Sequence, residues 1–96
     1  MKKFEKSTDI PDFPKCNTPE EHLQLCKEFI EAGAIPKSEL VEGAIYYGGC
    51  RNSEYAEWTG EKFVYKRTKF GNSYNEYINH FEDDDGYDLF IPIKKI

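Results

Sequence analysis

Two runs of alternating apolar and polar residues stand out in the second half of the chain. In residues 54–58 Ala56 and Trp58 share one side, and in residues 62–70 Arg67 shares a side with two aromatic rings. Alternation with a period of two is typical of strands that bury one face. The short segment between the runs, Thr59-Gly60-Glu61, has the composition of a turn. The pattern therefore predicts a β-hairpin.

Residues 19–32 instead have the spacing of an amphipathic α-helix. Thr18 can cap the first turn, Pro19 suits the first helical position, and Glu21 lies where a capping box has its acid. Gly33 is a typical residue after a helix, so we expect the helix to end at residue 31 or 32. The positions expected to face the core are Leu23, Leu25, Cys26, Phe29 and Ile30.

Three further segments are expected to contribute strands. Residues 44–47 and 87–93 are rich in β-branched and aromatic side chains. Residues 74–81 fit either a helix or a strand, and we favour a strand over residues 76–81. The acidic run at 82–86 would then be the loop of a second hairpin.

The fold class we predict is α+β, with one N-terminal amphipathic helix packed on a four-stranded antiparallel β-meander. Residues 1–17 are expected to form an extended N-terminal arm, frayed at its start and held later by Ile10 and Phe13, before a single domain over residues 18–96. A break is expected at residues 71–73. Pro92 has no amide hydrogen, which predicts that the last strand either lies at an edge of the sheet or ends there.

Composition and charge narrow the class of protein. The 96-residue chain has a net charge of −5, which argues against a protein that binds duplex DNA by neutralising phosphates. No apolar run is long enough to span a membrane, and the start of the chain lacks the apolar core of a signal peptide. Three cysteines are an odd number that suits free thiols in a reducing compartment. We therefore expect a cytoplasmic location.

Cysteine and histidine residues raise the question of a metal site. His22 and Cys26 are four residues apart on the expected helix, with Cys16 before it and Cys50 far along the chain. The paired Cys-x-x-Cys spacing of structural zinc sites is absent, and an apolar helix face is an ordinary place for a buried cysteine. We expect no metal and no cofactor, and whether these four residues come together stays open.

A catalytic interpretation would use Cys50 as a nucleophile with His80 or His22 as its base, and Arg51 to lower the pKa of the thiol. With carboxylates from residues 83–85, this gives the alternative of a small hydrolase or transferase. No signature of a known nucleophile surrounds Cys50. We therefore favour a protein that is not an enzyme.

The acidic run does not match a calcium-binding loop, because the spacing of its acids and the residue at the twelfth position, Pro92, do not fit that motif. A solvated hairpin loop is the simplest interpretation. The alternative is an electronegative contact surface formed by Asp83, Asp84 and Asp85, which could attract a basic partner.

Lys62, Lys66, Arg67 and Lys69 form a basic segment interleaved with aromatic residues. An ordinary amphipathic strand with buried rings is the favoured interpretation, and contact with a small anionic ligand or an acidic protein surface is the functional one. A second candidate is the loop at residues 50–52. Paired glycines before it would allow close approach to a ligand, although they could equally form a bulge.

The strings YYGGCRN, AEW, FVYKRTKFG and HFEDDDGYDLFIP resemble those of short uncharacterised proteins of the bacteriophage or prophage type. The resemblance covers the C-terminal two-thirds of the chain. It implies an accessory protein of the host cytoplasm that binds or inhibits another molecule, and it assigns no functional residue.

The sequence therefore favours a small non-enzymatic binding or inhibitory module. Its partner would be a host or self protein or a small anionic ligand, and neither duplex DNA nor a membrane. A homodimer would cover exposed aromatic rings or an open sheet edge. The candidate binding residues are Cys50, Arg51, Asn52, Trp58, Arg67, Asp83, Asp84 and Asp85.

Overall fold

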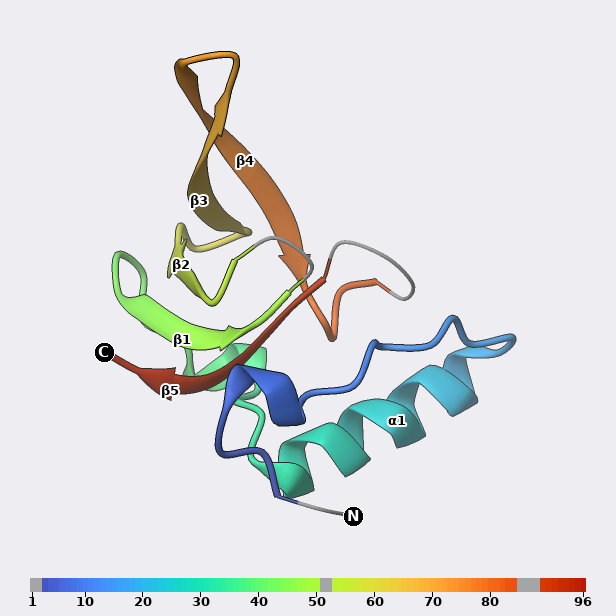
Figure 1. Cartoon of the computed structure of the whole chain (residues 1–96). Helices are drawn as coiled ribbons and strands as arrows, with labels where there is room; N and C mark the ends of the chain where they lie inside the picture. The colour runs from blue at the N-terminus through green and yellow to red at the C-terminus, as the bar shows by residue number, and fades with distance from the viewer. Residues whose placement is uncertain (1–2, 51–52, 85–88) are drawn as a thin grey trace.

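The computed structural model describes residues 3–50, 53–84 and 89–96 and shows a small β-barrel with one helix beside it (Figure 1). The elements in chain order are η1 (Ser7–Asp9), α1 (Pro19–Ala32), η2 (Lys37–Glu39), β1 (Ile45–Gly49), β2 (Tyr55–Trp58), β3 (Phe63–Lys69), β4 (Asn72–His80) and β5 (Leu89–Lys95). The predicted α+β class is confirmed. Among the described residues, no helix has the length and apolar character needed to cross a membrane.

The predicted helix is confirmed, together with its cap. The Thr18 hydroxyl accepts a hydrogen bond from the Glu21 amide at 3.1 Å, and Gly33 ends the helix with φ +124°. Cys26 and Phe29 are buried as expected. Leu23 was assigned to the core incorrectly, since 58% of its surface is exposed.

The first part of the N-terminal segment is better held than the sequence indicated. The amide of Phe4 donates to the carbonyl of Ala32 at 2.7 Å, and the Phe4 ring is buried against Phe29. The expectation of a frayed start is therefore wrong at Phe4. Phe13 is buried against the same helix, which confirms its predicted role.

The sheet differs from the predicted four-stranded antiparallel meander. Five strands in the order β1-β2-β3-β4-β5 close into a barrel, because β5 pairs with both β4 and β1. The β2–β3 hairpin is confirmed, with Trp58 opposite Phe63. β4 and β5 are parallel, so the acidic run that separates them is not a hairpin loop. Phe81 directly after β4 is fully buried in the core beneath α1, and the chain turns there, with the amide of Asp83 donating to the carbonyl of His80 at 2.9 Å.

Strand β5 contributes to two separate cores. Leu89 and Ile91 pack with α1 in one cluster, whereas Phe90 between them packs inside the barrel in the other. Alternate side chains of a strand point to opposite faces, so burial on both faces gives an unbroken apolar run. β5 therefore joins the helical layer to the barrel.

The predicted edge position is wrong for the start of β5, because Leu89 and Phe90 pair with β4 while β1 pairs along the other side of the strand. Pro92 lies beyond the pairing with β4, where a missing amide hydrogen interrupts no bond to that strand. On the side of β1, Pro92 lies opposite Gly48 at a register shift between Tyr47 and Gly48. A Cβ atom at Gly48 would lie 2.1 Å from the carbonyl oxygen of Ile91. β1 and β5 therefore approach each other more closely at this point than any side chain on Gly48 would allow.

Candidate functional site

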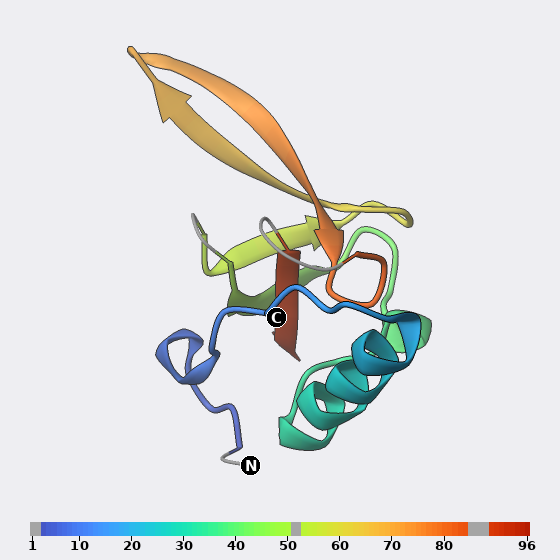
Figure 2. The same ribbon diagram turned by 90° about the vertical axis from the view of Figure 1, so that its right-hand side faces the viewer.

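Strands β3 and β4 form a long hairpin whose outer part, residues 66–75, we call the hairpin tip. The strands pair along their length, from Phe63 opposite Ile78 to Lys69 opposite Asn72. The inner pairs belong to the barrel, but the hairpin tip projects beyond the other elements (Figures 1 and 2). Every residue of the hairpin tip is exposed except Arg67, which is half-buried.

A two-residue turn, Phe70–Gly71, closes this hairpin with φ +52° and +79°. Positive φ at both central residues is typical of the type I′ turn, where Asn-Gly is preferred. Phe70 is the one non-glycine residue with positive φ in the described part of the chain, and it is 92% exposed. Backbone strain of this kind is concentrated at functional sites. The ring of Phe70 therefore packs on no core, and its backbone lies in a region that phenylalanine rarely adopts.

The hairpin tip has two faces, because residues opposite each other in an antiparallel pair project to the same side. Arg67 lies opposite Tyr74 on one face, which also carries Lys69. Lys66 lies on the other face, on the same side of the hairpin as Tyr77. Tyr74 is 42% and Tyr77 57% exposed. Each face therefore combines cationic and aromatic side chains in water.

Positive charge is concentrated in this part of the chain. The hairpin tip contains three basic residues and no carboxylate, so its charge is +3, and the remaining −8 gives the chain its net −5. Lys66 and Lys69 form no ion pair with any described residue. Arg67 donates to Glu76 at 3.1 Å, and this hydrogen bond raises the pKa of the guanidinium. The charge of Arg67 is thus partly balanced by Glu76, whereas Lys66 and Lys69 are not paired with described residues.

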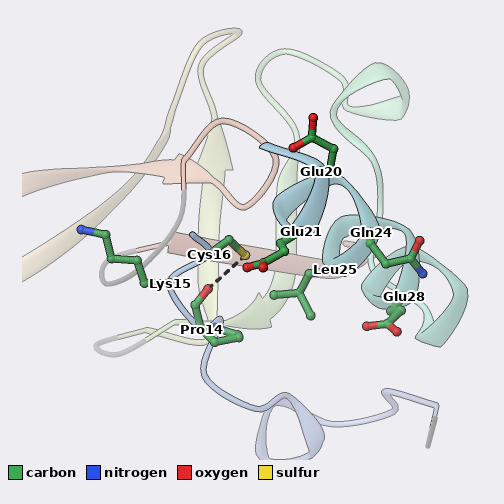
Figure 3. A pocket seen from close by; sticks show the side chains of 8 residues that line it. All are labelled: Pro14, Lys15, Cys16, Glu20, Glu21, Gln24, Leu25 and Glu28. Carbon is green, nitrogen blue, oxygen red and sulfur yellow. Dashed lines mark hydrogen bonds between the residues drawn. The ribbon is translucent and has the colours of Figure 1, made fainter. Parts of the chain in front are cut away.

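A groove of about 460 Å³ lies between α1 and the N-terminal segment (Figure 3). Pro14 and Leu25 contribute apolar surface, and Lys15 points away from the helix. Neither Glu20 nor Glu28 forms an ion pair with the described residues. The residues that line the groove are Pro14, Lys15, Cys16, Glu20, Glu21, Gln24, Leu25 and Glu28.

The loop after β1 is only partly described. Cys50 is half-buried against the barrel core, and its thiol donates to the carbonyl of Ser53 at 3.2 Å. The predicted binding residues Arg51 and Asn52 lie outside the described residues. Gly49 allows close approach of the Ile10 side chain rather than of a ligand, since a Cβ atom there would lie 3.0 Å from Ile10 Cδ1.

Trp58 lies in the barrel core. It is 4% exposed, its ring centroid is 4.9 Å from that of Phe63, and the ammonium of Lys37 lies 6.0 Å from its centroid. Trp58 therefore shares no exposed surface with Arg67, and packing accounts for its position.

The acidic run lies at the other end of β4 from the hairpin tip. The carboxylate of Asp83 pairs with Lys37 at 2.9 Å, and the backbone carbonyl of Asp84 contacts His22 Nε2 at 3.0 Å. Asp85 lies outside the described residues. His80 follows Tyr74 by six positions along β4, and six steps of an extended strand span about 20 Å. The acidic run and Arg67 therefore do not form one surface.

His80 is fully buried between aromatic rings at the end of β4. Nε2 lies 2.9 Å from the carbonyl of Ile35, so it carries the hydrogen, and Nδ1 accepts from the amide of Glu82 at 3.1 Å. Both ring nitrogens are occupied by the backbone. In this arrangement His80 has no lone pair left for the Cys50 thiol, so it is not placed to act as the base of the alternative catalytic hypothesis.

Burial lowers the pKa of His80, and this desolvation outweighs the opposing effects of the Ile35 hydrogen bond and of the nearby Glu82 and Asp83. The folded state thus binds a proton less readily than the unfolded chain. We expect stability to be complete above pH 6.5 and to fall as the pH drops below it, by at most about 1.4 kcal/mol per pH unit from this group. Urea unfolding of the wild type and of His80→Gln at several pH values would test this, and equal slopes would contradict it.

The cysteines and His22 do not converge on one site. His22 Nε2 lies 3.7 Å from Cys26 Sγ, whereas Cys16 lines the groove and Cys50 packs on the barrel. Burial, followed by the charges of Glu82 and Cys16, raises the pKa of Cys26 to about 11. No group of three or more potential metal-ligating side chains was found within the described ranges.

Sequence reasoning missed two parts of this picture. The favoured interpretation of the basic segment, with its rings in the core, is confirmed for Phe63 and Tyr65 but is wrong for Phe70, which is exposed. The exposed rings of Tyr74 and Tyr77 on the next strand were not predicted. The residues after Gly71 carry hydroxyl and amide groups but no carboxylates, so they lengthen the stretch around the basic residues that has no acidic side chain. This was one available signal that no carboxylate of the hairpin tip offsets its positive charge. The groove had no signal, since it depends on contact between segments that the sequence alone does not place.

A comparison of this chain with protein-family models, with curated proteins and with solved structures found no match. Its function is therefore inferred from the geometry of the hairpin tip and the groove.

Proposed function

We propose that the protein is a non-enzymatic binding module that docks its hairpin tip on an acidic surface of a partner protein. The observation that supports this most directly is that the hairpin tip projects from the molecule with Lys66, Lys69 and Phe70 exposed on it. Arg67 lies half-buried between them and pairs with Glu76. Arginine and large aromatic side chains are the residues that dominate the energy of protein interfaces. The resemblance to phage-type proteins implies that the partner is a protein of the bacterial cytoplasm.

The shape and charge of the molecule favour a protein partner over other anions. A projecting two-stranded ribbon encloses no volume for a small ligand, and the groove of the described chain lies elsewhere. Long nucleic acid would bring its phosphates towards a body that carries −8. An acidic patch on a protein can meet the hairpin tip without that repulsion.

Lys66→Ala/Lys69→Ala is expected to reduce recovery of the partner from a bacterial lysate at least about tenfold, because both faces of the hairpin tip lose a cation. The measurement is quantitative mass spectrometry after capture with the tagged protein. Both lysines are exposed, so the variant should fold.

The matched control is Lys94→Ala/Lys95→Ala, which removes the same charge from exposed positions of β5. This variant should recover the partner as the wild type does. Equal losses in the two variants would contradict a role for the hairpin tip. Recovery that disappears after nuclease treatment would instead identify a nucleic acid as the partner.

A further inference from the structure

The hairpin tip and the groove on α1 have complementary chemistry. The hairpin tip presents an exposed ring, Phe70, with the Lys69 ammonium 5.6 Å from its centroid. The groove offers apolar surface from Pro14 and Leu25 beside several carboxylates (Figure 3). Lys15 also lines the groove but points away from the helix, so the side formed by α1 is acidic. An apolar projection flanked by cations therefore matches an apolar depression that has anions on its helix side.

The charges on both sides lack partners that would compete. Lys66 and Lys69 form no ion pair with the described residues, and neither do Glu20 and Glu28 on the groove. α1 as a whole carries four glutamates and one lysine. Opposite patches of this kind steer two molecules together and fix their register.

The hairpin tip cannot reach the groove of its own chain. Figures 1 and 2 place the turn of the hairpin and α1 at opposite ends of the molecule in both views. The longest dimension of the molecule is 41 Å, and the hairpin is built into the barrel through Phe63 and Ile78. The contact must therefore form between two molecules.

We infer that the hairpin tip of one copy of this chain docks in the α1 groove of a second copy. Phe70 enters the groove beside Leu25, and Lys66 and Lys69 meet the carboxylates of Glu20 and Glu28. The groove is an open depression of about 460 Å³, which leaves room for a phenyl ring at the surface. This inference rests on the proposed function, because it names one acidic partner of the hairpin tip.

The unfavourable backbone of Phe70 has an explanation in this contact. Asn-Gly would satisfy a type I′ turn better than Phe-Gly, so the ring contributes nothing to the hairpin itself. Phe70→Asn consequently removes the docking residue and leaves the fold intact. It is a suitable variant for a binding test because a loss of association cannot be attributed to unfolding.

The test uses two variants that each lack one side of the contact. Phe70→Asn/Lys69→Glu removes the hairpin side, and Glu20→Lys/Glu28→Lys removes the groove side. Sedimentation velocity over a range of concentrations is expected to show association of the wild type, weakening as salt is raised, and at least about tenfold weaker association of each variant alone. Circular dichroism would confirm that both variants are folded.

Mixing the two variants restores one intact contact, since the groove variant has a native hairpin tip and the hairpin variant has a native groove. The mixture is therefore expected to form a one-to-one complex that neither variant forms with itself. A wild type that stays monomeric, or a mixture that stays monomeric, would overturn the inference.

These outcomes separate this inference from the proposed function. A monomeric wild type whose capture of another acidic protein still depends on Lys66 and Lys69 would overturn the self-association and leave the proposed function standing. Capture and association that both survive the loss of Lys66 and Lys69 would overturn both.

Discussion

Gly48→Ala is expected to destabilise the protein by about 3 kcal/mol or more, the upper part of the range for overpacked sites. The added Cβ atom would lie 2.1 Å from the carbonyl oxygen of Ile91 and 2.8 Å from Pro92 Cα. Both are backbone atoms, so no side-chain rotation relieves the clash. β1 and β5 would have to separate, and small domains have only about 5–15 kcal/mol of stability to lose. Urea unfolding monitored by tryptophan fluorescence would measure the change.

The neighbouring glycine is the control for this substitution. A Cβ atom at Gly49 would meet the end of the Ile10 side chain at 3.0 Å, and that atom can move. Gly49→Ala is the same chemical change on the same strand, and it is expected to cost less than about 1 kcal/mol. Similar losses for the two alanine variants would show that the close approach of β5 is not the cause.

Phe63→Ala is expected to cost about 3–5 kcal/mol, the usual loss for truncating a buried aromatic ring. Phe63 is fully buried at the centre of the barrel, with ring centroids 4.6 Å from Phe90 and 4.9 Å from Trp58. Its removal would leave a cavity lined by side chains from three strands. The midpoint of urea unfolding, with an unchanged slope, would give the difference in free energy.

Phe70→Ala provides the comparison, because it removes the same ring from the other end of the β3 hairpin. Phe70 is 92% exposed, so the free energy of unfolding should change by less than about 0.5 kcal/mol. A large loss at Phe70 would mean that the hairpin tip is packed against the body of the molecule.

Local patterns were sufficient to predict the elements whose partners are close in sequence. Both ends of α1 are set by hydrogen bonds within one turn: the Thr18 hydroxyl accepts from the Glu21 amide at the start, and the Gly33 amide donates to the carbonyls of the last turn. The β2–β3 hairpin follows from alternation on both sides of Gly60, whose φ is +105°. The turn at Phe70–Gly71 was placed incorrectly at residues 71–73, because phenylalanine is rarely found at positive φ.

Pairings between distant segments were not predictable in the same way. An acidic run between two strands fits a hairpin loop and a parallel connection equally well from composition alone. The unbroken apolar stretch from Leu89 to Pro92 was the available signal against an edge strand, because a strand that is apolar at every position is buried on both faces. The sequence alone does not show which residues would cover the second face of this strand. In the structure they come from distant segments and include Phe4 and Phe29.

Of the candidate binding residues, Arg67 is the one that the described structure leaves on the proposed surface. Trp58 was selected as the single tryptophan, yet large aromatic rings are also what a thin core needs, and burial prevailed. Asp83 pairs with Lys37 from η2, a contact 46 residues apart in the chain that no local pattern indicates. The sequence can suggest that a charged residue lies on a binding surface. Ion pairs formed in the folded protein then decide whether that charge is available to a partner.

The position of β5 between the two cores has a consequence for synthesis of the protein. β5 leaves the ribosome after every other described element. Phe90 completes the cluster inside the barrel, and Ile91 completes the cluster beneath α1. The helix and the first four strands therefore cannot complete either apolar cluster until β5 has been synthesised. Folding should then occur in one step rather than core by core, and nascent chains stalled before Leu89 should be cut readily by protease.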